Sequence, residues 1–286
     1  MKAAIVNWTE DEIQPMQNAE TVMNAMESCL RQAAAEGANL LVFPALTGCL
    51  YQYLSQSCRS IAELKEKADC KAYLEKASEL CRKYGVSLCP GSYWERIGED
   101  VFHASCLIAG GKIVLEQRQL YLARWERQTG LSRGTAAGLY EMDGWKVGIV
   151  LSTDVFYPQV SRLLAMKGAD IILSPAALAG SKNEALQLSG MWQEAQQNLF
   201  FALESGYNGF LGSRSFWGES VIHAPLEMTE DEDGLLSKRN NGNTVITAEL
   251  DNESRKKAIR RFDVLSMLNP AFYRKMQGFG EVRENG

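Results

Sequence analysis

The chain has 286 residues, of which 46% are hydrophobic and 23% charged, and its formal net charge is −5. These fractions are ordinary for a soluble globular protein and exclude a disordered chain. The net negative charge argues against a nucleic-acid surface, and no apolar run approaches the roughly 20 residues of a membrane-spanning helix.

The first third of the chain alternates between strand and helix patterns. Short apolar runs predict strands, and apolar residues at helical spacing predict helices. The first helix is expected to stop at Gly37, because glycine accepts the left-handed conformation that follows many helices. In order, we predict a strand at Ala3–Asn7, a helix at Gln17–Glu36, a strand at Leu40–Phe43, a helix at Ile61–Tyr84 and a strand at Val86–Trp94.

Two β-hairpins are predicted next. Gly110-Gly111 separates the strand patterns Ser105–Leu107 and Ile113–Glu116, and Asp143-Gly144 separates Gly138–Met142 and Val147–Leu151. Both dipeptides are strong signals for tight hairpin turns. Antiparallel pairs are therefore expected beside the alternating elements.

Ser152 stands at the junction of a predicted strand and a predicted helix. The continuous apolar run Val147–Leu151 is typical of a strand buried on both faces. Pro158 suits the first turn of a helix, where its missing N–H would be unpaired anyway. The turn between them is where an enzyme would hold a nucleophile, and its first residue is Ser152.

The remaining pattern is again α/β. We predict a helix at Tyr157–Lys167, a strand at Asp170–Pro175, a long helix at Glu184–Ser205, and strands at Gly209–Ser213, Ser220–His223 and Thr244–Glu249. A basic helix at Lys256–Arg261 and the segment Asn269–Arg274 follow.

No linker or shift in composition divides the sequence. We therefore expect one α/β domain over residues 1–286 with mixed sheets, ending in a tail at about 251–286. The first residues enter a strand pattern without a signal peptide's apolar core, so a cytoplasmic location is expected.

No metal site and no cofactor are expected. The seven cysteines are odd in number, form no C-x-x-C pair, and have only two histidines as co-ligands. The acidic segment Thr229–Gly234 lacks the terminal glutamate of an EF-hand loop. His103 and His223 each stand alone and are interpreted as structural imidazoles with satisfied hydrogen bonds.

An ordered set of motifs resembles the nitrilase superfamily of carbon–nitrogen hydrolases over nearly the whole chain. The set consists of Ala35–Pro44, Thr47-Gly48, Gly111–Val114, Arg118, Gly148–Asp154, Pro158, Arg162, Gly168–Pro175, Phe216–Ser220, Pro225 and Thr247–Asp251 with the basic helix after it. The resemblance implies a four-layer αββα sandwich, paired as a homodimer or higher homo-oligomer across the helices that flank the nucleophile. It also implies a Glu–Lys–Cys triad that attacks amides or nitriles.

Such a triad needs a thiolate to attack carbon, a carboxylate to move protons and an ammonium to stabilise the oxyanion. At the position of the family's glutamate, after Phe43-Pro44, this chain has Ala45. No Asp or Glu occurs in Leu41–Leu50, and the segment is about two residues shorter than the usual family spacing. Cys49 lies in this loop and is interpreted as a buried structural thiol.

The other two members of the triad are also replaced. The lysine position falls on Gln119, and the cysteine position falls on Ser152. Asp154 and Glu126, the position of a supporting glutamate, match the family. Serine is a poor nucleophile without a base, and glutamine cannot neutralise an oxyanion.

We therefore expect a catalytically inactive member of the superfamily, which binds a small amide- or carboxylate-bearing ligand or serves as a partner subunit. An active carbon–nitrogen hydrolase or acyl-transfer enzyme is the alternative, with Ser152 as nucleophile, Glu126 as base and Gln119 as oxyanion donor. Against the alternative, Glu126 could be a structural carboxylate that pairs with Arg118 or Arg124. A third reading is a structural oligomer component with a filled pocket.

Overall fold

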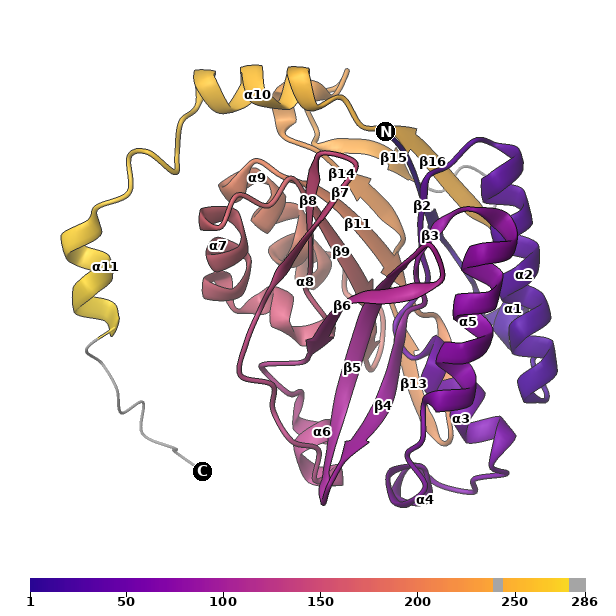
Figure 1. Ribbon diagram of the computed structural model, residues 1–286. Coiled ribbons are helices and arrows are strands. Elements are labelled where there is room, and N and C mark those ends of the chain that lie inside the picture. Colours follow the sequence, from indigo (N-terminus) through magenta and orange to yellow (C-terminus); the bar gives the residue numbers. More distant parts are fainter. Residues whose placement is uncertain (239–243, 278–286) are drawn as a thin grey trace.

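The computed structural model describes residues 1–238 and 244–277, so the last part of the predicted tail, 278–286, lies outside the described residues. Two large β-sheets face each other in the middle of the molecule (Figure 1). The first sheet runs in the order β16-β1-β2-β3-β5-β4, with β6 paired to β5. Its strands are β1 (Lys2–Val6), β2 (Leu40–Val42), β3 (Ser87–Cys89), β4 (Ser92–Ile97), β5 (Asp100–Ala109), β6 (Lys112–Arg118) and β16 (Val245–Glu249).

The second sheet runs in the order β15-β14-β11-β9-β8-β7. Its strands are β7 (Leu139–Met142), β8 (Trp145–Ile149), β9 (Ile171–Ala176), β11 (Phe201–Gly206), β14 (Val221–His223) and β15 (Leu235–Lys238). A small third sheet joins β10 (Leu178–Ala179), β13 (Arg214–Trp217) and β12 (Gly209–Leu211).

Helices cover the outer face of each large sheet (Figure 1). On the first sheet lie α2 (Ala19–Ala35), α3 (Thr47–Ser55) and α5 (Lys71–Tyr84), and on the second lie α7 (Pro158–Met166) and α9 (Gln193–Asn198). The other helices are α1 (Glu10–Ile13), α4 (Ile61–Glu66), α6 (Arg124–Thr129), α8 (Glu184–Gln187), α10 (Asn252–Arg261) and α11 (Pro270–Gln277). Short irregular helices are η1 (Ser152–Phe156), η2 (Leu188–Trp192) and η3 (Leu226–Met228).

Alternating side chains along the strands build three apolar layers. Ile5 of β1 packs between the two sheets, whereas its neighbour Val6 packs under the helices of the first sheet. On β11, Leu203 packs between the sheets and Ala202 packs toward α7 and α9. Burial of both faces explains the uninterrupted apolar runs of these strands, and the predicted αββα sandwich is confirmed.

Both predicted hairpins are present, with Leu107 opposite Leu115 and Tyr140 opposite Val147. Two predicted elements need correction, and one helix was missed. The strand Val86–Trp94 is two strands with a turn at Gly91, whose φ is +78°, and the helix Ile61–Tyr84 is α4 and α5. The helix α3, which begins only three residues after Pro44, was not predicted.

The largest error concerns the predicted helix Glu184–Ser205. The helical part ends at Asn198, Leu199 adopts a left-handed conformation, and Phe201–Gly206 forms β11, parallel to β9. A run of contiguous apolar residues satisfies helical spacing and two-sided strand burial equally well, so periodicity could not separate them.

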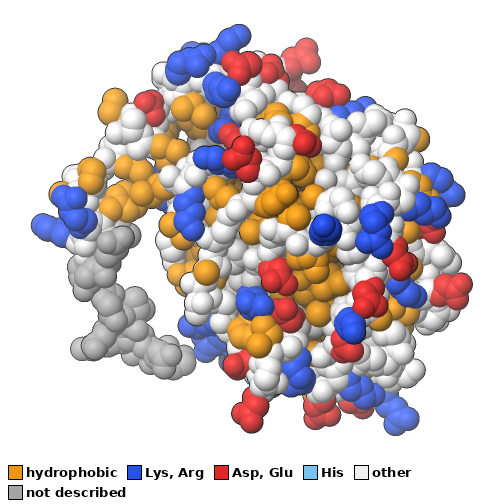
Figure 2. Space-filling view, viewed as in Figure 1, with side chains coloured by type: hydrophobic (Ala, Val, Ile, Leu, Met, Phe, Trp, Pro, Cys, Tyr) orange, Lys and Arg blue, Asp and Glu red, His pale blue; other side chains and the backbone are white. Residues whose placement is uncertain are grey.

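The chain after α10 leaves the sandwich as an arm that carries α11 (Figure 1), and Figure 2 shows apolar side chains along it. Among the described residues, no helix is long and apolar enough to cross a membrane.

Candidate functional site

Ser152 occupies a strained turn shortly after β8, the strand that lies between β9 and β7 in the second sheet. Its φ is +48°, in the left-handed region that non-glycine residues seldom adopt, and such strain is concentrated at functional sites. The side chain is 4% exposed, and Oγ donates a hydrogen bond to the carbonyl of Ala177 at 3.1 Å. Within the described part of the chain this is the only hydrogen bond of the Ser152 hydroxyl, so its proton is directed away from any base.

Gln119 is fully buried just beyond the end of β6. Its Nε2 lies 2.9 Å from Oε2 of Glu126, 2.8 Å from Oγ1 of Thr153 and 3.1 Å from the carbonyl of Tyr121. Three acceptors therefore surround a nitrogen that carries only two protons, whereas an ammonium would offer three. Its Oε1 has no partner among the described residues.

Glu126, which lies on α6, is held by a buried hydrogen-bond chain. Its Oε1 accepts from Nδ1 of His103 at 2.6 Å, and Nε2 of His103 lies 2.6 Å from Oγ of Ser92. The backbone N–H of Leu46 donates to the same Oγ at 2.7 Å. Glu126 and His103 are each 1% exposed, so the pair is screened from solvent.

The predicted partners of Glu126 are wrong. Arg118 binds Glu95 at 2.8 Å instead, and Glu126 uses His103 from the neighbouring strand β5. The expectation for His103 is confirmed, because both of its ring nitrogens are bonded. An isolated histidine that links β5 to α6 leaves no spacing signal in the sequence. The series of hydrogen bonds from Glu126 through His103 to Ser92 therefore could not be predicted.

The loop at the position of the family's acid is closed and apolar. Ala45 is fully buried, and Leu46 adopts a φ of +62° before α3 begins. Cys49 on α3 is also fully buried; burial raises the pKa of its thiol well above the ordinary value, and the charge of Glu126 adds to the shift. As expected, Cys49 is a structural thiol in an environment that disfavours the thiolate.

Asp154 connects the Ser152 turn to the segment that carries Gln119. Its carboxylate accepts the backbone N–H of Leu120 at 3.0 Å and that of Tyr121 at 2.7 Å. Burial raises the pKa of Asp154 to about 7, although the two backbone hydrogen bonds oppose the shift. The structure thus brings Gln119, Glu126 and Asp154 together, whereas Ser152 has no hydrogen bond to Glu126 in the described residues.

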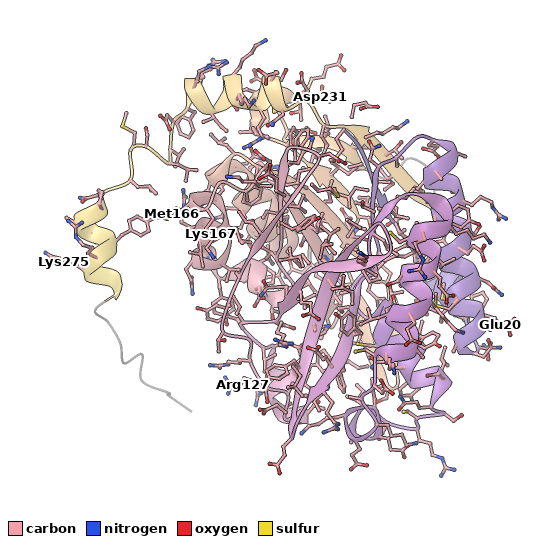
Figure 3. All side chains as sticks on the ribbon, in the orientation of Figure 1. Glu20, Arg127, Met166, Lys167, Asp231 and Lys275 are labelled. Atoms are coloured by element: carbon pink, nitrogen blue, oxygen red, sulfur yellow. The ribbon has the colours of Figure 1, made fainter. Side chains whose placement is uncertain are left out.

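A cavity of about 940 Å³ lies directly beside this cluster. Ala123, whose N–H binds Glu126, and Thr153, which accepts from Gln119, both form part of its wall. The other lining residues are Leu122, Arg124, Arg127, Gln128, Phe156 and Tyr157. Arg127, labelled in Figure 3, projects from α6 at the outer side of the molecule. Two guanidinium groups make the cavity suitable for an anionic ligand.

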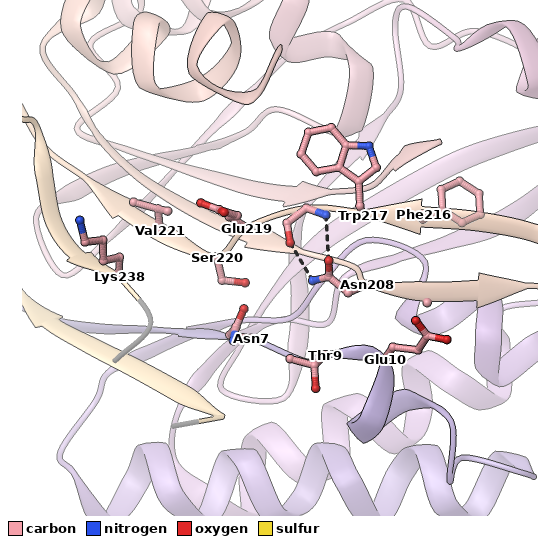
Figure 4. A pocket seen from close by; sticks show the side chains of 12 residues that line it. Asn7, Thr9, Glu10, Asn208, Phe216, Trp217, Glu219, Ser220, Val221 and Lys238 are labelled. Atoms are coloured by element: carbon pink, nitrogen blue, oxygen red, sulfur yellow. Dashed lines mark hydrogen bonds between the residues drawn. The ribbon is translucent and has the colours of Figure 1, made fainter. Parts of the chain in front are cut away.

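A second cavity of about 500 Å³ opens near the carboxyl ends of β1 and β11 (Figure 4). Asn208 crosses it, with its side-chain amide donating to the carbonyl of Gly218 at 2.7 Å and its side-chain oxygen accepting the N–H of Gly218 at 3.1 Å. In the ranges 1–238 and 244–277, no three His, Cys, Asp or Glu side chains converge in a way that could hold a metal ion.

Comparison with curated proteins places these features in a family. A family model described as carbon-nitrogen hydrolase matches residues 2–259. A probable hydrolase from Bacillus subtilis is 23% identical over 249 residues, which cover 85% of this chain and 48% of that protein, so the chain spans about half the length of this relative. A nitrilase from Pyrococcus abyssi is 24% identical over 242 residues, covering 82% of this chain and 88% of that one.

The fold is also similar to a solved amidase from Nesterenkonia sp. AN1. A double mutant of that amidase, with one glutamate and one cysteine replaced, is in complex with acrylamide; it superposes with a TM-score of 0.76 at 20% identity, covering 96% of this chain and 97% of that one. The match of the family model over most of the chain, together with the αββα fold, shows that this chain belongs to the carbon–nitrogen hydrolases of the nitrilase superfamily.

Proposed function

We propose that this chain is a member of the superfamily without its hydrolytic chemistry, and that it binds a small carboxylate- or amide-bearing ligand in the cavity of Arg124 and Arg127. The observation that carries the proposal is the commitment of Gln119 and Ser152. Gln119 directs its amide protons toward Glu126, Thr153 and Tyr121, and Ser152 directs its proton to the carbonyl of Ala177. In the described residues, the amide protons of Gln119 are therefore already used and do not point to an incoming carbonyl. The hydroxyl of Ser152 has no hydrogen bond to a base that could accept its proton.

The loss of reaction rate expected when a catalytic triad is replaced supports this proposal. Removal of a single oxyanion donor costs roughly 10²–10³ in rate, and removal of a complete triad costs up to about 10⁶ in the best-measured enzyme. Ala45 contributes no proton-transfer group, and Glu126 is bonded to His103 rather than to Ser152. Binding can persist without the reaction, as the acrylamide complex of the doubly substituted amidase suggests.

The alternative is an active enzyme that uses Ser152 and Glu126. The strained φ of Ser152 favours it, because strain of this kind is retained where the surrounding structure requires it. In that case Ser152 would turn from Ala177 toward the cavity when substrate binds, and Glu126 would have to give up a hydrogen bond to act as base.

Ligand binding can be tested with the arginines of the cavity. Isothermal titration with small dicarboxylates and their monoamides is expected to give saturable binding that is at least about tenfold weaker in Arg124→Gln/Arg127→Gln, because charge-assisted hydrogen bonds to carboxylate are lost. Arg133→Gln, an exposed arginine outside the cavity wall, is the control. Absence of binding, or binding unchanged in the double variant, would contradict the proposal.

Self-association is part of the same proposal. Five large apolar side chains are exposed on α7 and on the arm: Leu163 and Met166 of α7, and Phe262, Met267 and Phe272 of the arm. The most exposed of them is Met267, at 84%. Met166, labelled in Figure 3, lies on the side of α7 toward α11. Apolar groups gathered on two neighbouring elements are typical of an interface, and a second copy of this chain is the partner that we propose.

A further inference from the structure

The short helix α6 carries both arginines of the cavity described above. Arg124 and Arg127 are exposed and line that cavity, whereas Trp125 and Glu126 of the same helix are buried. The helix has only six residues, and a helix of this length is marginal by itself. Contacts of its two buried side chains with the rest of the molecule therefore decide where the two arginines point.

Trp125 is the apolar anchor of α6. Its ring lies 5.4 Å from that of Phe216 in an edge-on contact, and 6.4 Å from that of Trp94 in a stacked one. Burial of apolar surface is favourable but has little directionality. Trp125 therefore fixes how deeply the helix lies in the molecule more strongly than how the helix is turned about its axis.

Glu126 is the polar anchor, and it projects about 100° around the helix axis from Trp125. Its Oε2 accepts the backbone N–H of Ala123 at 2.7 Å and Nε2 of Gln119 at 2.9 Å. Both donors belong to the segment that leads into α6. The third donor is Nδ1 of His103, at 2.6 Å from Oε1, and it is the one that belongs to a strand of the first sheet. Hydrogen bonds to a carboxylate are strong and directional.

His103 is itself held firmly in the sheet. Its Nε2 lies 2.6 Å from Oγ of Ser92 on β4, and the imidazole is 1% exposed. In the pairing of β4 with β5, His103 lies opposite Trp94, the residue on which Trp125 stacks. The apolar and the polar anchor of α6 thus reach neighbouring positions of one sheet, and two such contacts define the rotation of the helix.

We infer that His103 is a positioning residue of the arginine cavity. Its hydrogen bond to Glu126 sets the rotation of α6 and thereby directs Arg124 and Arg127 toward the same anion. His103 does not line the cavity, so it acts through the helix, and recognition of a carboxylate by guanidinium groups depends on their orientation. The inference rests on the function proposed for this cavity, and it gives Glu126 a role that requires no proton transfer.

Two substitutions of similar size test the hydrogen bond. In His103→Asn the side-chain amide can take the place of the Nδ1 donor, whereas His103→Leu offers no donor to Glu126. In titrations of the full-length protein with succinate, we expect the dissociation constant of His103→Asn to stay within about twofold of the wild type. That of His103→Leu should rise about tenfold.

Amide hydrogen exchange reports on α6 without any ligand. The N–H of Arg127 donates to the carbonyl of Ala123 at 3.1 Å in the first turn of the helix. We expect this amide to exchange faster in His103→Leu than in the wild type, and at the wild-type rate in His103→Asn, because the helix is released only in the first.

The second histidine provides a matched control. His223 also binds a buried glutamate, with Nε2 at 2.9 Å from Oε2 of Glu204, but it lies on β14 in the other sheet. Its Nδ1 has no partner in the described residues, so the expectation of a fully satisfied imidazole is wrong for this histidine. His223→Leu removes the same kind of hydrogen bond and should leave the affinity for succinate and the exchange of Arg127 unchanged.

The outcomes separate this inference from the function of the cavity. Equal succinate affinity in His103→Leu and the wild type, or weakening in His223→Leu as large as in His103→Leu, would overturn the positioning role. If the wild type binds no succinate, the function proposed for the cavity fails, and unchanged exchange of Arg127 in His103→Leu would then reject the positioning of α6 as well. Should His103→Leu not fold, Ser92→Ala removes the support of the imidazole with little change in volume. Its succinate affinity should fall about threefold, and an unchanged affinity would count against the inference.

Discussion

At the scale of single residues, the site is organised by buried polar groups rather than by exposed ones. Asp154 illustrates this, because one carboxylate holds the backbone of Leu120 and Tyr121 and thereby fixes the distance between the Gln119 segment and the Ser152 turn. A carboxylate in this position is costly to ionise, and its pKa is raised to about 7.

The raised pKa makes stability depend on pH. Because the folded-state pKa of about 7 exceeds the ordinary 3.8, the folded state binds the proton more tightly, and the free energy of unfolding should fall as pH rises between these values. We expect roughly 2–4 kcal/mol of this dependence to disappear in Asp154→Asn. Urea unfolding at several pH values measures it, with the exposed Asp231→Asn (Figure 3) as control. Equal pH dependence in wild type and Asp154→Asn would contradict the account.

Part of the site could be predicted from the resemblance to the nitrilase superfamily. Gln119 and Glu126 are seven residues apart, and they meet as their positions in the motif suggested. Ser92 and His103 could not be found, because strand pairing and the placement of α6 bring them to Glu126. Spacing in the sequence predicts contacts within one element or one turn. It does not predict contacts between separate elements such as β4, β5 and α6.

At the scale of elements, prediction succeeded where local chemistry decides the structure. Gly110-Gly111 and Asp143-Gly144 form their turns because these residues accept positive φ, and Pro158 starts α7. It failed for Phe201–Gly206, whose strand conformation is imposed by pairing with β9 and β14 rather than by its own residues.

Ser57, at the end of α3, offers a test of this local chemistry. It adopts a φ of +51° and is exposed, so Ser57→Gly should relieve strain and raise the free energy of unfolding by about 0.5–1 kcal/mol. The same substitution inside α5, Ser78→Gly, should lower it by a similar amount, because glycine is unfavourable within a helix. Changes of the same sign in the two variants would refute this reasoning.

At the scale of the whole molecule, the αββα sandwich leaves one helical layer and the arm with uncovered apolar residues. We expect sedimentation analysis to show a dimer for the wild type and a monomer for Leu163→Glu/Met166→Glu, because buried carboxylates would oppose the interface. Ile97→Glu, an exposed apolar position at the far end of β4, should leave the dimer intact. A monomeric wild type, or a double variant that remains dimeric, would exclude this interface.

The central claim is that this protein does not hydrolyse carbon–nitrogen bonds. An assay of ammonia release tests that claim most directly. Purified protein and its Ser152→Ala variant would be incubated with a pooled set of amides, ureido acids and nitriles. The account predicts no release above the uncatalysed level from either protein, because the hydroxyl of Ser152 is bonded to Ala177 and has no base. Release by the wild type that is lost in Ser152→Ala would contradict it and establish Ser152 as a working nucleophile.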